Sequence, residues 1–504
     1  MIQVAALSPT LPTYDELPYD SLPVPEAHPE YLAAIARLHG FAAADPRRAR
    51  VLELGCASGG NLLPIAWYAP DSPCIGIELS RVQAEAGQAL TAAAGIVNAR
   101  ILHDDLAALP ESLGEFDYIV AHGLYSWVSP AVQSAVLRLC ARHLADNGIA
   151  YVSYNVLPGW SSRQALRKYL LQQIARVRTP SEQVDAARRA LVQLAAEWAG
   201  STLGRFPDLP AEIAYLEKAS AGYLYHEYLA DINEPLAFGE FLSRAHTQGL
   251  GYLCDAGAGL CARQVPLRAA LAEQRFDEQE RTRFRRSLLI RHGSPRETPE
   301  PETALETLAF HASLRCDEEV DLDTPTPQRF TNSRGTDFVV RRPLCKAAFI
   351  VLAAVYPESI SYRDLLEAAR GLLQQFGATA LIDDLELFRQ EWLSLVYAHA
   401  TRANITTQTF FSDLSVAPRA HALARAQAAS GAGTVAGAHH AALDLDAGGR
   451  DLLSLLDGGN SRVALTAKLL ARCEARGEGL SVEEVAANND RLLQLFARNA
   501  LLIA

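Results

Sequence analysis

A glycine-rich stretch with an acidic residue in front of it carries the clearest chemistry in the sequence. It runs from Val51 to Asn61 and has the pattern of a buried strand, a tight turn and the start of a helix. About one strand and one helix later, Cys74 to Ser80 has the pattern of a second buried strand, which ends with the carboxylate of Glu78. Glycines let the backbone approach a ligand, and an acid at the end of the second strand can hold ribose hydroxyls. The pair therefore predicts a doubly wound sheet that binds an adenosine cofactor.

The adenosine cofactor could be a dinucleotide or S-adenosylmethionine, and Glu53 favours the second. It lies two residues before Gly55, where dinucleotide sites usually carry an apolar residue. The spacing Glu53-x-Gly55-x-Ala57-x-Gly59 is similar to the acidic-x-Gly-x-Gly-x-Gly signature of class I S-adenosylmethionine-dependent methyltransferases. Ala57 departs from that signature, at little cost if this residue need not take a positive φ. A glycine-rich turn without a ligand remains the alternative interpretation of the motif.

The composition argues against several classes of protein. With 504 residues and about 150 residues per domain, the chain has room for about three domains. The net charge is −12 and no long basic run is present, so nucleic acid is a poor candidate partner. Eight cysteines are scattered without a C-x-x-C pair, which argues against a zinc site or a disulfide framework. The sequence has neither a basic leader followed by an apolar run nor a stretch of about 18 apolar residues, which predicts a cytoplasmic protein without membrane insertion.

Strands and helices are expected to alternate through the first part of the chain. Strands are predicted over 50–54, 74–79, 99–104, 116–121 and 148–154, and helices over 61–69, 80–94 and 130–145. Asn61, Ser80 and Ser129 are suitable N-terminal caps for these helices. Alternation with short connections predicts an α/β fold with a doubly wound, Rossmann-like parallel sheet. This cofactor-binding core is assigned to 1–160.

The pattern changes after residue 160. Two helices are expected within 161–203, and the whole stretch 161–230 is interpreted as a helical insertion that caps the site or forms a homodimer contact. Strands at 250–254 and 281–292 are expected to return to the edge of the same sheet. Residues 231–295 would therefore complete the sheet.

A stretch rich in proline, glutamate and threonine at 293–303 predicts a linker to a C-terminal α+β region over 304–504. Within that region, a hairpin over 329–340 and helices over 344–355 and 361–374 form a plausible winged-helix pattern.

A further boundary is expected near 415–445. Residues 431–437 are interpreted as a flexible loop, and the neighbouring pair His439-His440 as a surface feature.

Several other runs carry a family resemblance. They are Tyr14 to Tyr19, Phe116 to Val128, Tyr151 to Trp160, Tyr223 to Leu229 and Asn233 to Pro235. Together with the turn from Glu53 to Asn61, they resemble bacterial class I methyltransferases that carry a methyltransferase regulatory domain. The rickettsial lysine methyltransferases of outer-membrane protein B have this organisation. The resemblance covers nearly the whole chain and implies an S-adenosylmethionine-dependent enzyme that methylates lysine side chains of a protein or peptide substrate.

The resemblance also implies where the cofactor would lie. Glu53 would orient the amino group, the turn backbone would approach the methionine part, and Glu78 would accept from both ribose hydroxyls because a carboxylate offers paired acceptors. The adenine amino group is expected at Asp104, with Asp105 as the adjacent alternative. The full expected cofactor-binding set is Glu53, Gly55, Cys56, Ala57, Gly59, Asn61, Glu78, Leu79, Asp104, Asp105 and His122.

Aromatic residues near the strand ends predict a channel for the methyl acceptor. Ligand-binding crevices open at the carboxyl ends of parallel strands, and aromatic walls attract a cation. Packing in the core is the alternative interpretation, notably for Trp127. The expected substrate-side set is Tyr14 and Tyr19, which could fold over the site as a lid, with His122, Tyr125, Trp127 and Tyr154.

Methyl transfer from a sulfonium needs in-line placement and exclusion of water more than it needs acid–base groups. The sequence identifies no general base. Two other functions stay open at this point: methylation of a small metabolite or peptide, and a non-catalytic cofactor-binding regulator. A protein substrate requires an open cleft and a metabolite a closed one.

Overall fold

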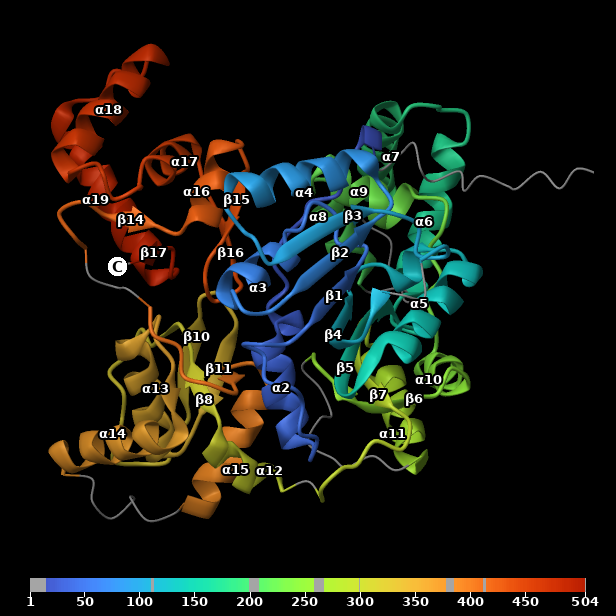
Figure 1. Ribbon diagram of the computed structural model, residues 1–504, viewed down its shortest axis with the longest axis horizontal. Coiled ribbons are helices and arrows are strands. Elements are labelled where there is room, and N and C mark those ends of the chain that lie inside the picture. The colour runs from blue at the N-terminus through green and yellow to red at the C-terminus, as the bar shows by residue number, and fades with distance from the viewer. Residues whose placement is uncertain are drawn as a thin grey trace, which may run out of the picture.

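The centre of the protein is a seven-stranded sheet, seen in a computed structural model that describes residues 15–109, 113–198, 208–257, 267–298, 300–377, 385–410 and 414–503 (Figure 1). The strand order is β3-β2-β1-β4-β5-β7-β6. The strands are β1 (Val51–Leu54), β2 (Cys74–Glu78), β3 (Ala99–His103), β4 (Phe116–Ala121), β5 (Leu144–Asn155), β6 (Leu250–Asp255) and β7 (Phe284–Arg291). Strands β1 to β5 pair in parallel, whereas β7 is antiparallel to both β5 and β6. The predicted Rossmann-like sheet and its returning edge are confirmed.

Helices cover both faces of the sheet because successive strand residues point to opposite sides. Val51 packs into one apolar cluster with α2 (Pro29–Leu38), α3 (Leu62–Tyr68) and α4 (Arg81–Ala93). Its neighbour Leu52 packs into the other cluster, with α5 (Pro130–His143) and α10 (Phe238–Thr247). Helix α11 (Leu267–Glu280) follows β6.

The expected caps act at two of the three helices. Ser80 accepts from the backbone N–H of Gln83, and Ser129 accepts from that of Val132. Asn61 precedes α3 but makes no side-chain cap. Its amide is used elsewhere, in the site described below.

The helical insertion has a core of its own. It contains α6 (Ser161–Ile174), α7 (Pro180–Trp198), α8 (Leu209–Leu216), α9 (Ala221–Leu224) and the π-helix η4 (Tyr225–Leu229). Helices α6 and α7 are the two helices expected within 161–203, and α7 begins at Pro180. Figure 1 shows the insertion in green beside the strands of the sheet.

The segment after the linker forms a middle unit (305–404) with two small sheets. Strands β8 (Ala309–His311), β12 (Ile360–Ser361) and β13 (Arg402–Asn404) form one, and β9 (Leu314–Arg315), β10 (Gln328–Asn332) and β11 (Asp337–Val340) form the other. Helices α13 (Pro343–Val355), α14 (Tyr362–Gln375) and α15 (Leu385–Tyr397) pack against them. The hairpin and the two helices expected over 329–374 are therefore present.

The linker does not separate two independent cores. One continuous apolar cluster contains Leu32 and Ile35 of α2 together with Phe310, Phe349 and Trp392 of the middle unit. Glu26 also pairs with Arg402 at 3.2 Å across this junction. The boundary expected near residue 295 is thus a boundary of the sheet but not of the core.

The last unit follows the middle one and packs around a third cluster. It contains β14 (Arg419–Ala420), α16 (Ala422–Ala429), β15 (Thr434–Ala436), β16 (Ala442–Asp444), α17 (Ala447–Ser454), α18 (Arg462–Ala475), α19 (Val482–Arg498) and β17 (Leu502–Ile503). Strands β15 and β16 pair as a hairpin, so part of the stretch interpreted as a flexible loop is a strand. His439 and His440 lie at its tip and are 8% and 2% exposed, so the expectation of a surface pair is wrong. Within the described ranges, the molecule has no helix of a length and apolarity suited to crossing a membrane.

Candidate active site

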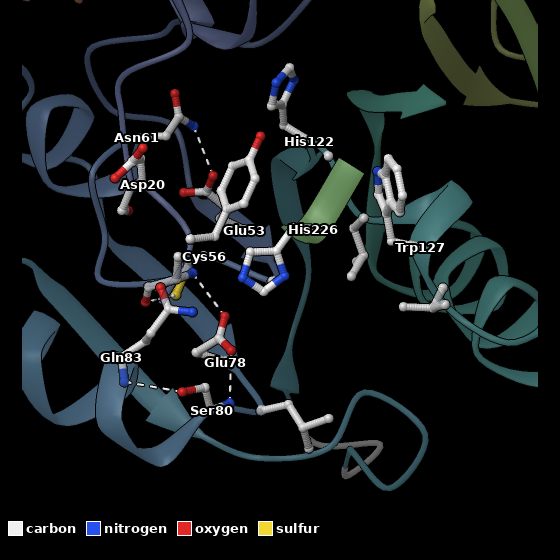
Figure 2. A pocket seen from close by; sticks show the side chains of 18 of the residues that line it. Asp20, Glu53, Cys56, Asn61, Glu78, Ser80, Gln83, His122, Trp127 and His226 are labelled. Atoms are coloured by element: carbon white, nitrogen blue, oxygen red, sulfur yellow. Dashed lines mark hydrogen bonds between the residues drawn. The ribbon is translucent and has the colours of Figure 1, made fainter. Parts of the chain in front are cut away.

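A cavity of about 750 Å³ opens at the carboxyl ends of β1, β2 and β4, beneath the helical insertion (Figure 2). Of the expected cofactor residues, nine line it: Glu53, Gly55, Cys56, Ala57, Asn61, Glu78, Leu79, Asp105 and His122. Of the expected substrate residues, Tyr19, His122 and Trp127 line it. Tyr14 lies outside the described residues.

The turn after β1 depends on left-handed backbone at three positions. Gly55 and Gly59 have φ of 71° and 79°, and Ala57 has φ of 50°. The condition under which Ala57 would cost little is therefore not met, and an alanine there costs about 1 kcal/mol relative to ordinary backbone. Gly59 does not line the cavity; a Cβ there would lie 2.8 Å from Ile101 Cδ1. Its role is therefore to close the turn.

Glu53 is a buried carboxyl with one free oxygen. Its side chain ends at the turn, where Oε1 accepts from Asn61 Nδ2 at 2.9 Å. Oε2 has no partner among the described residues. Burial raises the pKa of Glu53 to about 8, against the lowering effect of the Asn61 bond. A buried acceptor without a partner fits a cationic amino group, which would also favour ionisation of the carboxyl.

Glu78 ends β2 with both oxygens bound to backbone. Oε2 accepts from the N–H of Ala57 and Oε1 from that of Ser80, each at 2.8 Å. Burial raises the pKa of Glu78, and these N–H bonds oppose the shift. Each oxygen of a carboxylate can accept more than one bond, so the side chain can still accept from two hydroxyls. Its place in the cavity wall fits the role expected for ribose.

The neighbouring acid in the wall is Asp105. Asp104 does not line the cavity; its Oδ1 accepts from the N–H of Asp105 at 2.8 Å. Of the two residues expected near adenine, Asp105 is thus the one that lines the cavity. The cause is local, since Asp104 N bonds to Glu78 O and extends the β2–β3 pairing by one residue.

A segment near the N-terminus folds over the turn. Ser21 Oγ accepts from the N–H of Gly60 at 2.8 Å, and the N–H of Val24 donates to Asn61 Oδ1 at 2.9 Å. A Cβ on Gly60 would lie 2.1 Å from Ser21 O, so this contact requires a glycine. Sequence reasoning did not single out Gly60; the Gly59-Gly60 pair was the available signal.

The opposite wall of the cavity comes largely from the insertion. Burial raises the pKa of Glu227 to about 7, with Arg163 opposing the shift. Tyr19 OH donates to Glu227 Oε1 at 3.4 Å, and the Arg163 guanidinium lies 5.4 Å from the Trp160 ring centroid. Figure 2 shows His226 and Trp127 directed into the same space. These residues were missed except for Tyr19 and Trp127, although the particular run from Tyr223 to Leu229 marked the region.

His122 joins the two walls as a neutral group. Its Nδ1 lies 2.9 Å from Tyr151 OH. Burial, with Arg286 nearby, lowers the pKa of His122 to about 4. It is therefore suited to hydrogen bonding rather than to carrying charge near neutral pH.

Tyr125 and Tyr154 are core residues, contrary to the expectation of a substrate channel. They are 0% and 1% exposed and do not line the cavity. Tyr154 stacks on Phe241 with centroids 4.0 Å apart, and Tyr125 meets the same ring edge-on. Helix α10 supplies this partner, which sequence reasoning did not connect with the strand ends.

Three family models match successive parts of the chain. They are the methyltransferase domain over 51–148, the predicted methyltransferase regulatory domain over 220–291 and the PKMT C-terminal winged helix domain over 417–501. Two proteins of Rickettsia prowazekii are similar in sequence. RP789 is 35% identical over 48% of this chain and 44% of its own length, and RP028 is 34% identical over 46% of this chain and 93% of its own.

The chain belongs to the S-adenosylmethionine-dependent methyltransferases with a methyltransferase regulatory domain. The match spans less than half the length of RP789. The fold of this chain is similar to that of PKMT2 from Rickettsia typhi, which has been solved alone and in complex with AdoHcy. The complex gives a TM-score of 0.83 at 24% identity, covering 97% of this chain and 100% of that one. The structure without ligand gives 0.81 at 25%, covering 96% and 100%.

The winged-helix match changes one assignment made from sequence. The model covers 417–501, the last unit, and not the hairpin and helices over 329–374. Both units pair a hairpin with helices, so the sequence pattern of the middle unit also predicts a winged helix.

Proposed function

We propose that this methyltransferase acts on lysine side chains of a protein substrate. The observation that carries the proposal is Glu227, a carboxyl on the cap whose side chain lines the cavity that Glu53 and Glu78 also line. Aromatic side chains surround the approach to it: Tyr19, Trp127, Trp160, Tyr223 and Phe284. An aromatic wall attracts an ammonium group and then accepts the apolar stem behind it. The resemblance to lysine methyltransferases supports the same acceptor.

When bound, S-adenosylmethionine supplies a methyl group on an activated sulfonium. The acceptor ammonium must lose one proton before its nitrogen has a lone pair to bond to that methyl carbon. Glu227 can take this proton, since a carboxyl of pKa about 7 is ionised in an appreciable fraction of molecules at neutral pH. Desolvation of the amine lowers its own pKa in the same direction. The proton then leaves Glu227 for solvent past Tyr19, which is 38% exposed.

The remaining residues of the cavity orient the cofactor and exclude water. Glu53 Oε2 and the two oxygens of Glu78 would hold the amino group and the ribose. The segment over Gly60 and the insertion cover the turn, which keeps water from the reacting atoms. Arg163 is occupied by Glu212, to which it donates at 2.8 Å, so it does not neutralise Glu227 by direct pairing.

The test is methyl transfer from isotope-labelled S-adenosylmethionine into a protein lysate, followed by mass spectrometry of the labelled products. Methyl groups on lysine Nζ, lost when Glu227 is replaced by glutamine, are expected. Label found only on small molecules, or only on carboxylates and hydroxyls, would contradict the lysine acceptor. Label found only on small molecules would favour methylation of a metabolite instead.

A homodimer through the helical insertion is a further part of the proposal. Val192 of α7 and Tyr215 of α8 are 60% and 53% exposed on its surface. Sedimentation velocity of the wild type and of Tyr215→Glu tests this contact. A wild type that stays monomeric at micromolar concentration would contradict it.

A further inference from the structure

The hairpin β15–β16 of the winged-helix unit reaches the turn that follows β1. In Figure 1 it lies beside α3, with α16 next to α4. Trp67 of α3 packs against His421 with ring centroids 4.2 Å apart, which joins the unit to the sheet domain. The tip packs closely against the end of α19, where a Cβ on Gly437 would lie 2.3 Å from Asn499 O. The position of the tip is therefore set by the winged-helix unit.

His440 at this tip bonds to a residue of the cofactor turn. Its Nε2 lies 2.6 Å from Asn61 Oδ1, and 379 residues separate the two in the chain. Asn61 Nδ2 in turn donates to Glu53 Oε1 at 2.9 Å. The side chains of His440 and Asn61 thus connect the winged-helix unit to the carboxyl group of Glu53.

The directions of these bonds are determined by the partners. Since Asn61 Nδ2 donates to Glu53, the amide oxygen faces His440, and it also accepts from the N–H of Val24. An oxygen accepts only from a donor, so His440 must carry its proton on Nε2. Its Nδ1 has no partner among the described residues, which agrees with the neutral tautomer. Burial lowers the pKa of His440 well below its usual range, so this tautomer persists at physiological pH.

The surroundings leave His440 little freedom. It is 2% exposed, its backbone is left-handed with φ of 56°, and its ring meets His28 edge-on with centroids 4.9 Å apart. A buried donor in a fixed position can hold the Asn61 amide in one orientation. Without it, only the N–H of Val24 holds the amide oxygen, and the bond from Asn61 Nδ2 to Glu53 Oε1 is less well fixed.

We propose that the winged-helix unit completes the cofactor site, with His440 as a positioning residue that acts on Glu53 through Asn61. This inference rests on the proposed function only for the identity of the ligand. It assigns a role to the C-terminal unit that does not require contact with substrate. By linkage, cofactor binding and docking of the hairpin stabilise each other by the same free energy.

The experiment compares His440 with its neighbour in the full-length protein. His439 stacks on His311 with centroids 4.4 Å apart and lies in the same buried junction, but it does not reach Asn61. Calorimetry with S-adenosylhomocysteine is run on wild type, His440→Ala, His439→Ala and His440→Gln, and thermal unfolding is followed for each. Glutamine can present an N–H close to the position of Nε2 and so serves as the rescue variant.

His440→Ala is expected to weaken S-adenosylhomocysteine binding about three- to tenfold, the equivalent of one buried hydrogen bond. His439→Ala should lower the unfolding temperature while leaving affinity within about twofold, and His440→Gln should recover most of the lost affinity. In turnover assays, His440→Ala should raise KM for S-adenosylmethionine more than it lowers kcat.

Equal affinity of wild type and His440→Ala would overturn the inference, as would equal losses in the two alanine variants. If His440→Ala does not fold, hydrogen exchange of the wild type decides. Ligand must then slow exchange at the amides of 437–440, and unchanged exchange there would overturn the inference. A wild type that binds no S-adenosylhomocysteine would instead reject the cofactor assignment itself.

Discussion

The two walls of the cavity are built in different ways. The cofactor wall comes mostly from two short runs, 53–61 and 77–83, in which backbone N–H groups and left-handed turns do much of the work. The opposite wall, or acceptor wall, is formed by residues from three distant segments: Tyr19, His122, Trp127 and Glu227. Of these, Tyr19 and Glu227 are 208 residues apart in the chain. A site made by local backbone leaves a motif in the sequence, whereas a site assembled by tertiary folding leaves only scattered residues.

The two walls also use a buried carboxyl for different tasks. Glu53 is 4% exposed and bonded to Asn61 at 2.9 Å, which suits a group held in one position that ionises when a cationic amino group binds. Glu227 is half-buried and has a longer bond of 3.4 Å to Tyr19, which suits a group that takes and releases a proton. The pKa is raised in both, to about 8 and about 7. Burial raises both values, so the hydrogen-bond partners distinguish the roles.

The largest expected effect comes from cutting the chain at residue 295. All residues that line the cavity lie before this point, yet we expect 1–295 to aggregate and to show no cooperative unfolding by circular dichroism. The reason is the cluster shared between α2 and the middle unit, whose loss exposes Leu32 and Ile35. A soluble, cooperatively folded 1–295 that binds S-adenosylhomocysteine would show that the walls are independent of the C-terminal units.

Tyr125→Ala and Trp127→Ala should separate core from cavity. Tyr125 is fully buried against Phe241, so its loss should cost about 3–5 kcal/mol of unfolding free energy. Trp127 lines the cavity, so its loss should lower turnover more than stability. Urea unfolding and initial rates measure the two effects. The opposite assignment would move Trp127 into the core and Tyr125 into the acceptor wall.

Glu227→Gln should lower kcat about 100-fold without changing S-adenosylhomocysteine affinity, as expected for loss of a proton acceptor. In the wild type, kcat should rise with pH through about 7, because the ionised carboxyl is the active form. The variant should lack this rise. A variant with the wild-type pH profile would exclude Glu227 as the group that takes the proton.

Glu53→Gln should weaken S-adenosylmethionine binding about 30-fold, the effect of removing a charged hydrogen-bond partner. Its pH effect on stability has a definite sign. The folded protein keeps this carboxyl protonated up to about pH 8, whereas the unfolded chain ionises it near 4.5, so its contribution to stability falls between these values as pH rises.

The glutamine variant should therefore lose less stability than wild type between pH 5 and pH 8, as measured by thermal unfolding at about those two values. Wild type should also release protons on binding at pH 7, detected by calorimetry in buffers of different ionisation enthalpy. No proton release would mean that Glu53 is already ionised in the free protein.

The smallest expected effect is at Ala57. Glycine would relieve the left-handed backbone, by about 1 kcal/mol, but would add unfolded-state entropy of similar size. We expect Ala57→Gly to change stability by less than about 0.5 kcal/mol and to leave cofactor affinity unchanged. A large gain in either would show that the alanine strains the cofactor wall.

Much of the fold could be predicted because its signals are periodic. The seven strands of the sheet follow from short apolar runs that alternate with helical segments, and caps such as Ser80 mark helix starts. Helix α11, between β6 and β7, was not predicted. What failed depended on distant partners. Asn61 has the chemistry of a cap, but Glu53 and His440 bind its amide. Tyr154 lies near the carboxyl end of β5, but its ring stacks on Phe241 in the core.

The sequence by itself determined the cofactor wall, since a strand, a turn with positive φ and a second carboxylate are local features that residue types dictate. Only the tertiary structure decided which aromatic residues face the cavity, that Glu227 lies opposite the turn, and that a histidine near the C-terminus supports it. The physical reason is that burial and hydrogen-bond partners belong to the packed chain. A histidine at 440 and a glutamate at 227 have no fixed surroundings until segments hundreds of residues apart meet.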